Sequence, residues 1–117
     1  MEADRLTRGI ELFNRAEFFA AHEALEDVWR AAPAAEKKFF QGLVQVAVAF
    51  HHHSTGNFVG MQSVLRRAVS NLEKCPANFH GIDVRSLLEC LAGWADAIEH
   101  NLPLPAMPRM ERLVQEQ

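Results

Sequence analysis

Two side chains in the first third of the sequence have the spacing of a metal-binding or catalytic pair. His22 and Glu26 lie four residues apart, so they are neighbours on one face of a helix. Such a pair can supply two ligands to a divalent metal, or a carboxylate that orients an imidazole acting as ligand or base. The segment is not the zinc-protease pattern HExxH, because Glu26 stands where the second histidine would be. The alternative is that His22 and Glu26 satisfy each other at the edge of the core.

A second set of polar residues follows in the next predicted helix. Gln41, Gln45 and His52 are separated by four and seven residues, so they form one polar line along an otherwise apolar helix. Unpaired buried amides and imidazoles cost about 1–3 kcal/mol each. We therefore expect the line to meet the His22 edge across an antiparallel hairpin, or else to form a hydrogen-bond network that only fixes helix register. The site hypothesis assigns as metal ligands His22, Glu26 and His52, and as ligand-binding residues Gln41, Gln45 and Trp29.

Two histidines and one carboxylate suit zinc, iron, manganese or nickel, and the sequence does not choose among these metals. Hydrolysis would follow if the metal kept an open water position, because metal binding acidifies bound water. No residue demands a reaction, so whether the protein is an enzyme stays open. The remaining histidines, His51, His53, His80 and His100, are expected at the surface. Helical rotation of about 100° per residue turns His51 and His53 away from His52.

Periodic apolar residues predict five helices that would position these side chains, over residues 4–15, 18–30, 36–53, 58–74 and 84–98, with Ala31-Ala32-Pro33 ending the second. The third is apolar on nearly all sides, which is typical of the buried centre of a domain. Asn57 and Asp83 are expected to cap the fourth and fifth helices. Phe58 is placed on the apolar stripe of the fourth helix, and Cys75-Pro76 ends that helix before a loop through His80 and Gly81.

The chain also contains a weak internal repeat. A shift of 40 residues aligns residues 13–25 with 53–65, pairing small residues at Ala16 and Gly56 and placing phenylalanine at 18 and 58. Each half is predicted as a helix, a tight turn and a second helix. The predicted fold class is all-α, a compact bundle of about five helices built from two antiparallel helical hairpins, a closing helix and a C-terminal tail. Residues 1–117 form one domain, with core helices in 1–101 and a proline-rich strap and short amphipathic tail in 102–117 that contains Met110, Leu113 and Val114.

Composition narrows the class of protein further. The 117 residues are 49% hydrophobic, enough for one core, and 12 Lys and Arg against 15 Asp and Glu give a net charge of −3. This balance argues against a nucleic-acid or anionic-membrane partner. The start of the chain lacks the features of a secretory signal, and no apolar run reaches the roughly 18 residues of a membrane span, so a cytoplasmic location is expected. Cys75 and Cys90 lack CxxC spacing and are expected to be reduced thiols.

Several of these segments together resemble one known family. The residues His22, Glu26 and Trp29 form the pattern HxxxExxW, preceded by GIELFNRAEFF at 9–19 and followed by FFQGLVQVAVAFHH at 39–52 and by Gly56-Asn57. In this combination the sequence resembles the bacterial and archaeal family called domain of unknown function 309. The resemblance implies a helical bundle and a metal-binding role for the HxxxExxW residues. It implies no reaction.

Two functions therefore compete. The first is an uncharacterised bundle that binds a divalent metal or small molecule in a His/Glu/Gln-lined cleft between the second and third helices. The second is a non-enzymatic module that binds a peptide or another copy of the chain, with a purely structural polar network. In the second interpretation Met61, Met107 and Met110 are exposed contact residues, although packing in the core is the commoner use of methionine.

Overall fold

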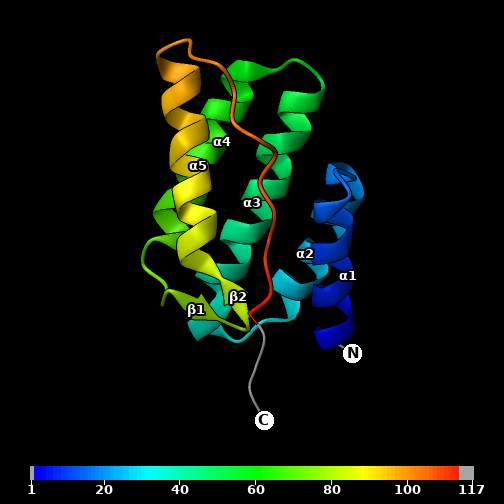
Figure 1. Cartoon of the computed structure of the whole chain (residues 1–117). Coiled ribbons are helices and arrows are strands. Elements are labelled where there is room, and N and C mark those ends of the chain that lie inside the picture. Colours follow the sequence, from blue (N-terminus) through cyan, green and yellow to red (C-terminus); the bar gives the residue numbers. More distant parts are fainter. Residues whose placement is uncertain (1, 114–117) are drawn as a thin grey trace.

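Five helices pack in chain order in the computed structural model, which describes residues 2–113 (Figure 1). They are α1 (Glu2–Asn14), α2 (Phe18–Ala31), α3 (Lys37–Ser54), α4 (Phe58–Leu72) and α5 (Val84–Glu99), and the short 3₁₀ turn η1 (Ala34–Glu36) joins α2 to α3. α1 packs on α2, α2 on α3, and α3 on α4. The predicted all-α bundle is confirmed. Within the described residues, no helix is both long enough and apolar enough to cross a bilayer.

The core forms around α3, as its all-round apolar sequence predicts. The Phe50 ring lies at its centre, with ring centroids 6.2 Å from Phe13, 5.9 Å from Phe18 and 5.0 Å from Trp94. α3 thereby joins the first helical hairpin, which is formed by α1 and α2, to α5. The buried residues of α3 are Phe39, Phe40, Gly42, Leu43, Val44, Val46, Ala47, Ala49 and Phe50.

The described core contains no buried polar or charged residue. The prediction that Gln41, Gln45 and His52 form a buried polar line therefore overstates their burial, because all three are only half-buried. Their polar atoms retain access to water, so they do not incur the full desolvation cost that a buried position would impose.

The internal repeat corresponds to a repeated turn. Ala16 and Gly56 both adopt the left-handed conformation, with φ of 66° and 80°. In each turn the third residue after the helix donates its N–H to a carbonyl five residues earlier, from Glu17 to Leu12 at 2.9 Å and from Asn57 to His52 at 2.8 Å. This bond pattern satisfies the last carbonyls of α1 and α3. Small residues occur at 16 and 56 because a side chain disfavours this conformation.

Two side-chain caps confirm the predicted starts of the later helices. Asn57 Oδ1 accepts a hydrogen bond from the Gly60 N–H at 2.9 Å, and Asp83 Oδ1 accepts one from the Ser86 N–H at 3.1 Å. Each cap satisfies an N–H of the first helical turn that has no partner within the helix.

The predicted loop before α5 contains a small β-hairpin. Its strands β1 (Asn78–Phe79) and β2 (Ile82–Asp83) are antiparallel. His80 and Gly81 form the two-residue turn, with φ of 53° and 74°. Positive φ at both positions is the signature of the type I′ turn, whose twist matches that of the paired strands.

The C-terminal strap, described as residues 102–113, is extended as predicted and runs back along the bundle between α5 and the first hairpin (Figure 1). The indole Nε1–H of Trp94 donates to the Ala106 carbonyl at 3.0 Å. The Asn14 side chain donates to the Met110 carbonyl at 3.2 Å and accepts from the Met110 N–H at 2.8 Å. Trp94 thus fixes the strap to α5, and Asn14 fixes it to α1.

The end of the strap pairs with the β-hairpin rather than forming an amphipathic tail. Asp83 N–H donates to the Glu111 carbonyl at 3.0 Å, and Leu113 N–H donates to the Gly81 carbonyl at 2.8 Å. Met110 is fully buried beside this pairing, while Leu113 is exposed. Val114, the other apolar residue of the predicted tail, lies outside the described residues.

Candidate functional site

His22 and Glu26, the predicted ligand pair, have separate local partners in the structure. Both side chains are half-buried on α2. The Nδ1 atom of His22 lies 3.2 Å from the carbonyl oxygen of Phe19, which can only accept a hydrogen bond. Glu26 Oε1 lies 3.2 Å from the guanidinium of Arg30, one turn further along the helix. Each of the two therefore has its own local partner.

The polar line on α3 faces α4, whereas it was expected to face α2. Asn71 on α4 donates to Gln45 Oε1 at 2.8 Å, and Asn57 at the start of α4 donates to His52 Nδ1 at 3.3 Å. The histidine that approaches α2 is His51, whose ring centroid lies 5.4 Å from that of Phe19. α3 has a helix on each side, and one residue of rotation decides which helix a side chain meets, so Gln45 and His52 do not join the His22 edge as expected. Within residues 2–113, no group of three or more His, Cys, Asp or Glu is arranged to hold a metal ion.

Trp29 lies at the far end of α2 from His22. Lys37 Nζ lies 5.8 Å from the centre of its indole ring. The same ammonium group donates to the carbonyl oxygens of Trp29 and Arg30, at 2.8 and 2.9 Å. These contacts cap the C-terminus of α2, so in this structure the tryptophan belongs to the junction between α2 and α3.

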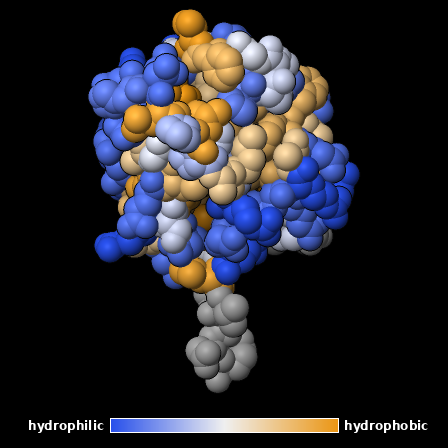
Figure 2. Space-filling view, turned by 45° about the horizontal axis from the view of Figure 1, so that its top comes forward, coloured by the Kyte–Doolittle hydropathy of each residue, from blue (hydrophilic) through white to orange (hydrophobic). Residues whose placement is uncertain are grey.

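Exposed apolar side chains gather at one end of the bundle. The turns at Ala16 and Gly56 and the end of α5 lie there (Figure 1). With this end tilted toward the viewer, hydrophobic residues spread from the top edge across the middle of the surface, and hydrophilic residues lie mainly to the left and lower right (Figure 2). We call this surface the turn end and define it by five exposed residues: Phe19 (55% exposed), Phe58 (49%), Val59 (80%), Leu102 and Leu104.

Histidines lie between these apolar residues and point in different directions, as helical rotation predicts. His51 contacts Phe19 on α2, whereas the His53 ring lies 5.5 Å from Phe58 and 5.1 Å from Trp94. His53 Nδ1 is buried without a hydrogen-bond partner among the described residues. His51 and His53 were expected at the surface, but both are half-buried, as His22 and His52 are. The histidines therefore contribute largely ring surface to the turn end.

Two sequence expectations about exposure are wrong. Phe58 was placed on the apolar stripe of its helix, but packing of α4 begins one turn later, at the fully buried Met61. Met61 and Met110 were expected to be exposed contact residues, but both are buried and pack in the core. Met107 alone of the three is exposed, at 45%. The turn end itself was missed. Its signal was the pairs Phe18-Phe19 and Phe58-Val59 at the starts of amphipathic helices. Adjacent helical residues point about 100° apart, so a helix that is covered on one side only leaves part of such a pair exposed.

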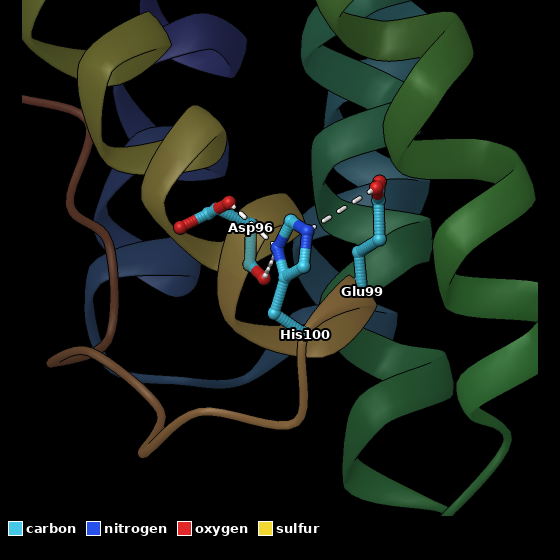
Figure 3. A network of polar contacts seen from close by, with 3 residues as sticks. All are labelled: Asp96, Glu99 and His100. Carbon is cyan, nitrogen blue, oxygen red and sulfur yellow. Dashed lines mark hydrogen bonds and ion pairs between the residues drawn. The ribbon is translucent and has the colours of Figure 1, made fainter.

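His100 ends α5 at the same end of the molecule and forms a small polar network (Figure 3). Its Nδ1 lies 3.2 Å from the carbonyl oxygen and 2.9 Å from a carboxylate oxygen of Asp96, and its Nε2 lies 3.7 Å from the Glu99 carboxylate. The hydrogen bond to the Asp96 carbonyl, then that to the Asp96 carboxylate, raises the pKa of His100 above about 6.5. The ring is exposed, as the sequence predicts for His100.

We expect the protonation of His100 to strengthen the end of α5. Because the folded-state pKa is raised, the stabilising contribution is complete below the unfolded value of about 6.5 and is lost as pH rises through the folded value. NMR titration of the His100 ring protons measures this pKa directly. Asp96→Asn is expected to lower it, since the carboxylate charge is removed. An equal pKa in wild type and Asp96→Asn would contradict the assignment of the carboxylate as a cause.

Comparison with known proteins gives relatives that are themselves uncharacterised. An uncharacterized protein of Aquifex aeolicus (strain VF5) is 35% identical over 96 residues, which cover 79% of this chain and 29% of that protein. The uncharacterized protein YpuF of Bacillus subtilis (strain 168) is 29% identical over 93 residues, covering 77% of this chain and 53% of YpuF. The chain thus spans about half or less of the length of these two relatives. The family described as Domain of unknown function (DUF309) matches residues 6–64, and this chain belongs to that family.

Proposed function

We propose that this chain is an interaction domain that pairs with a second copy of itself through the turn end. The observation that carries the proposal is the presence, at one end of the bundle, of five large exposed apolar residues from three separate segments: α2, α4 and the strap. Single exposed apolar residues are common on protein surfaces, whereas a group of large ones at one place often marks a contact site. Its removal from water would drive association.

The charge of the chain favours a second copy as the occupant. The five residues that define the turn end are apolar and carry no charge. Two copies related by a twofold axis place the same residues opposite one another, so like charges in the contact would repel. The net charge of the chain is −3, and an uncharged patch on an acidic molecule is the surface on which two copies meet with least repulsion.

Light scattering on purified protein over a range of concentrations tests this proposal. Wild type is expected to rise with concentration from 13.2 kDa toward twice that mass. The double variant Phe58→Ser, Val59→Ser is expected to stay at the mass of one chain. Because Val59 is 80% and Phe58 49% exposed, the variant loses little native packing, and its far-ultraviolet circular dichroism should match wild type.

Leu113→Ser is the matched control, because it also removes an exposed large apolar side chain but lies at the opposite end of the bundle, where it pairs with Gly81. It is expected to associate as wild type does. A wild type that remains a single chain at all concentrations would refute the proposal. A double variant that associates as strongly as Leu113→Ser would also refute the proposal.

Divalent-metal binding by His22, Glu26 and His52 stays a prediction from the sequence, supported by the i, i+4 spacing of the first two. The purified protein tests it through its metal content and its melting temperature with added zinc, iron, manganese or nickel. Binding predicts that His22→Ala lowers both. Equal values in wild type and His22→Ala would rule out His22 as a ligand.

A further inference from the structure

A cavity of about 600 Å³ opens at the end of the bundle opposite the turn end. Its wall is formed by α1, the end of α2, η1, α3, the β-hairpin and the strap. Leu6, Val28 and Phe40 supply apolar wall and are themselves buried in the core. The volume falls within the roughly 300–1,000 Å³ of small-molecule sites, which are mostly apolar with a few converging polar groups.

One polar group of the cavity is an imidazole held in a fixed orientation. His80 Nε2 lies 2.9 Å from Glu36 Oε1 on η1. The imidazole also lies nearly parallel to the Phe39 ring, with centroids 5.8 Å apart and planes at 19°, and 5.0 Å from the Phe40 ring. The left-handed conformation of His80 in the type I′ turn aims it at these partners. His80 therefore occupies one oxygen of the Glu36 carboxylate at the cavity wall.

A guanidinium group lies across the cavity on the strap. Arg112 Nη2 donates to the Thr7 hydroxyl on α1 at 3.3 Å, and both residues line the cavity. Among the side chains of residues 5–113, no carboxylate forms a salt bridge with Arg112, whereas Arg109 on the same strap pairs with Glu111 at 3.0 Å. Arg112 therefore presents a cation whose partner in this structure is a neutral hydroxyl.

We propose that this cavity binds a small organic carboxylate with an apolar body. The planar fork of a guanidinium matches the two oxygens of a carboxylate, and such charge-assisted bonds are stronger than neutral ones. The acid group would lie on Arg112 and the Thr7 hydroxyl, with the His80 imidazole on its other side. The apolar body would lie against Leu6 and Phe40. This site is separate from the turn end, so it neither requires nor excludes association of two copies.

NMR titration of the ¹⁵N-labelled full chain with phenylacetate tests the proposal. Saturable shifts are expected at Gly81 and Arg112, with a dissociation constant of about 1 mM or tighter. Arg112→Gln removes the charged hydrogen bonds and is expected to weaken binding about 10- to 100-fold. Arg109→Gln removes an arginine from the same strap outside the cavity and is expected to bind as wild type. Arg112→Lys keeps the charge without the planar fork and is expected to fall between the two.

Two neutral or inorganic probes decide which part of the ligand is recognised. 2-Phenylethanol has the same apolar body without the acid, and inorganic phosphate has the negative charge without the apolar body; both are expected to bind at least tenfold more weakly than phenylacetate. Equal binding of either probe would overturn the assignment to an organic carboxylate. The absence of saturable shifts with phenylacetate, or equal affinity in Arg112→Gln, Arg112→Lys and wild type, would overturn the site.

Discussion

Trp94→Ala is expected to lower the free energy of unfolding by about 3–5 kcal/mol, measured by urea denaturation followed by circular dichroism. The indole is 1% exposed and packs edge to face on Phe50 and His53, with centroids 5.0 and 5.1 Å away. Truncation would leave a cavity between α3 and α5 that these rings can fill only in part. It would also remove the hydrogen bond to the Ala106 carbonyl that fixes the strap.

Trp94→Phe separates the two contributions. It keeps an aromatic ring against Phe50 but cannot donate to Ala106, whose exposed position lets water replace the lost bond. We expect a loss of about 1–2 kcal/mol, from one hydrogen bond and a smaller ring. A loss as large as that of Trp94→Ala would show that the strap contact, and not ring packing, dominates. A loss below about 1 kcal/mol for Trp94→Ala would contradict the central place of this residue in the core.

Asn14→Ala is expected to cost about 2–4 kcal/mol, because it leaves both the N–H and the carbonyl of the buried Met110 without their partner. Amide hydrogen exchange at Met110 should speed up more than exchange in α3, since the strap would open from α1 before the core unfolds. Chemical denaturation with exchange measured by NMR checks both expectations.

Asn14→Asp is the matched variant for this contact. Its carboxylate still accepts from the Met110 N–H but cannot donate to the Met110 carbonyl until it is protonated. Stability relative to wild type should therefore improve as pH falls through the pKa of the new carboxyl group. A pH-independent difference between Asn14→Asp and wild type would mean that the bond to the carbonyl contributes little.

The helices and their caps were predictable because their causes are local. Apolar residues at helical spacing identified each helix, and Asn57 and Asp83 each bond to an N–H three residues along the chain. The all-apolar α3 was correctly placed at the centre. The β-hairpin was not predicted, because strands of two residues are too short to show alternation and one of its partners is the distant Arg112. The dipeptide His80-Gly81 was its only local signal.

The geometry of the predicted site could not be obtained from spacing alone. Spacing correctly places Gln45 and His52 on one face of α3, but it does not reveal which neighbouring helix that face meets. The choice of α4 follows from packing of the whole bundle, and it separates Gln45 from His22 by the width of α3. Exposure of Phe58 has the same origin, since the apolar stripe of α4 extends beyond the level at which α4 is covered.

The pairing of Leu113 with Gly81 determines which end of the molecule would face outward if the protein were attached to a surface through a linker. It brings residue 113 to the end of the bundle where α1 also begins, away from the turn end (Figure 1). A linker attached near residue 113 or near the start of α1 would therefore hold the molecule by the end opposite the turn end. The turn end would then face away from the surface to which the molecule is attached.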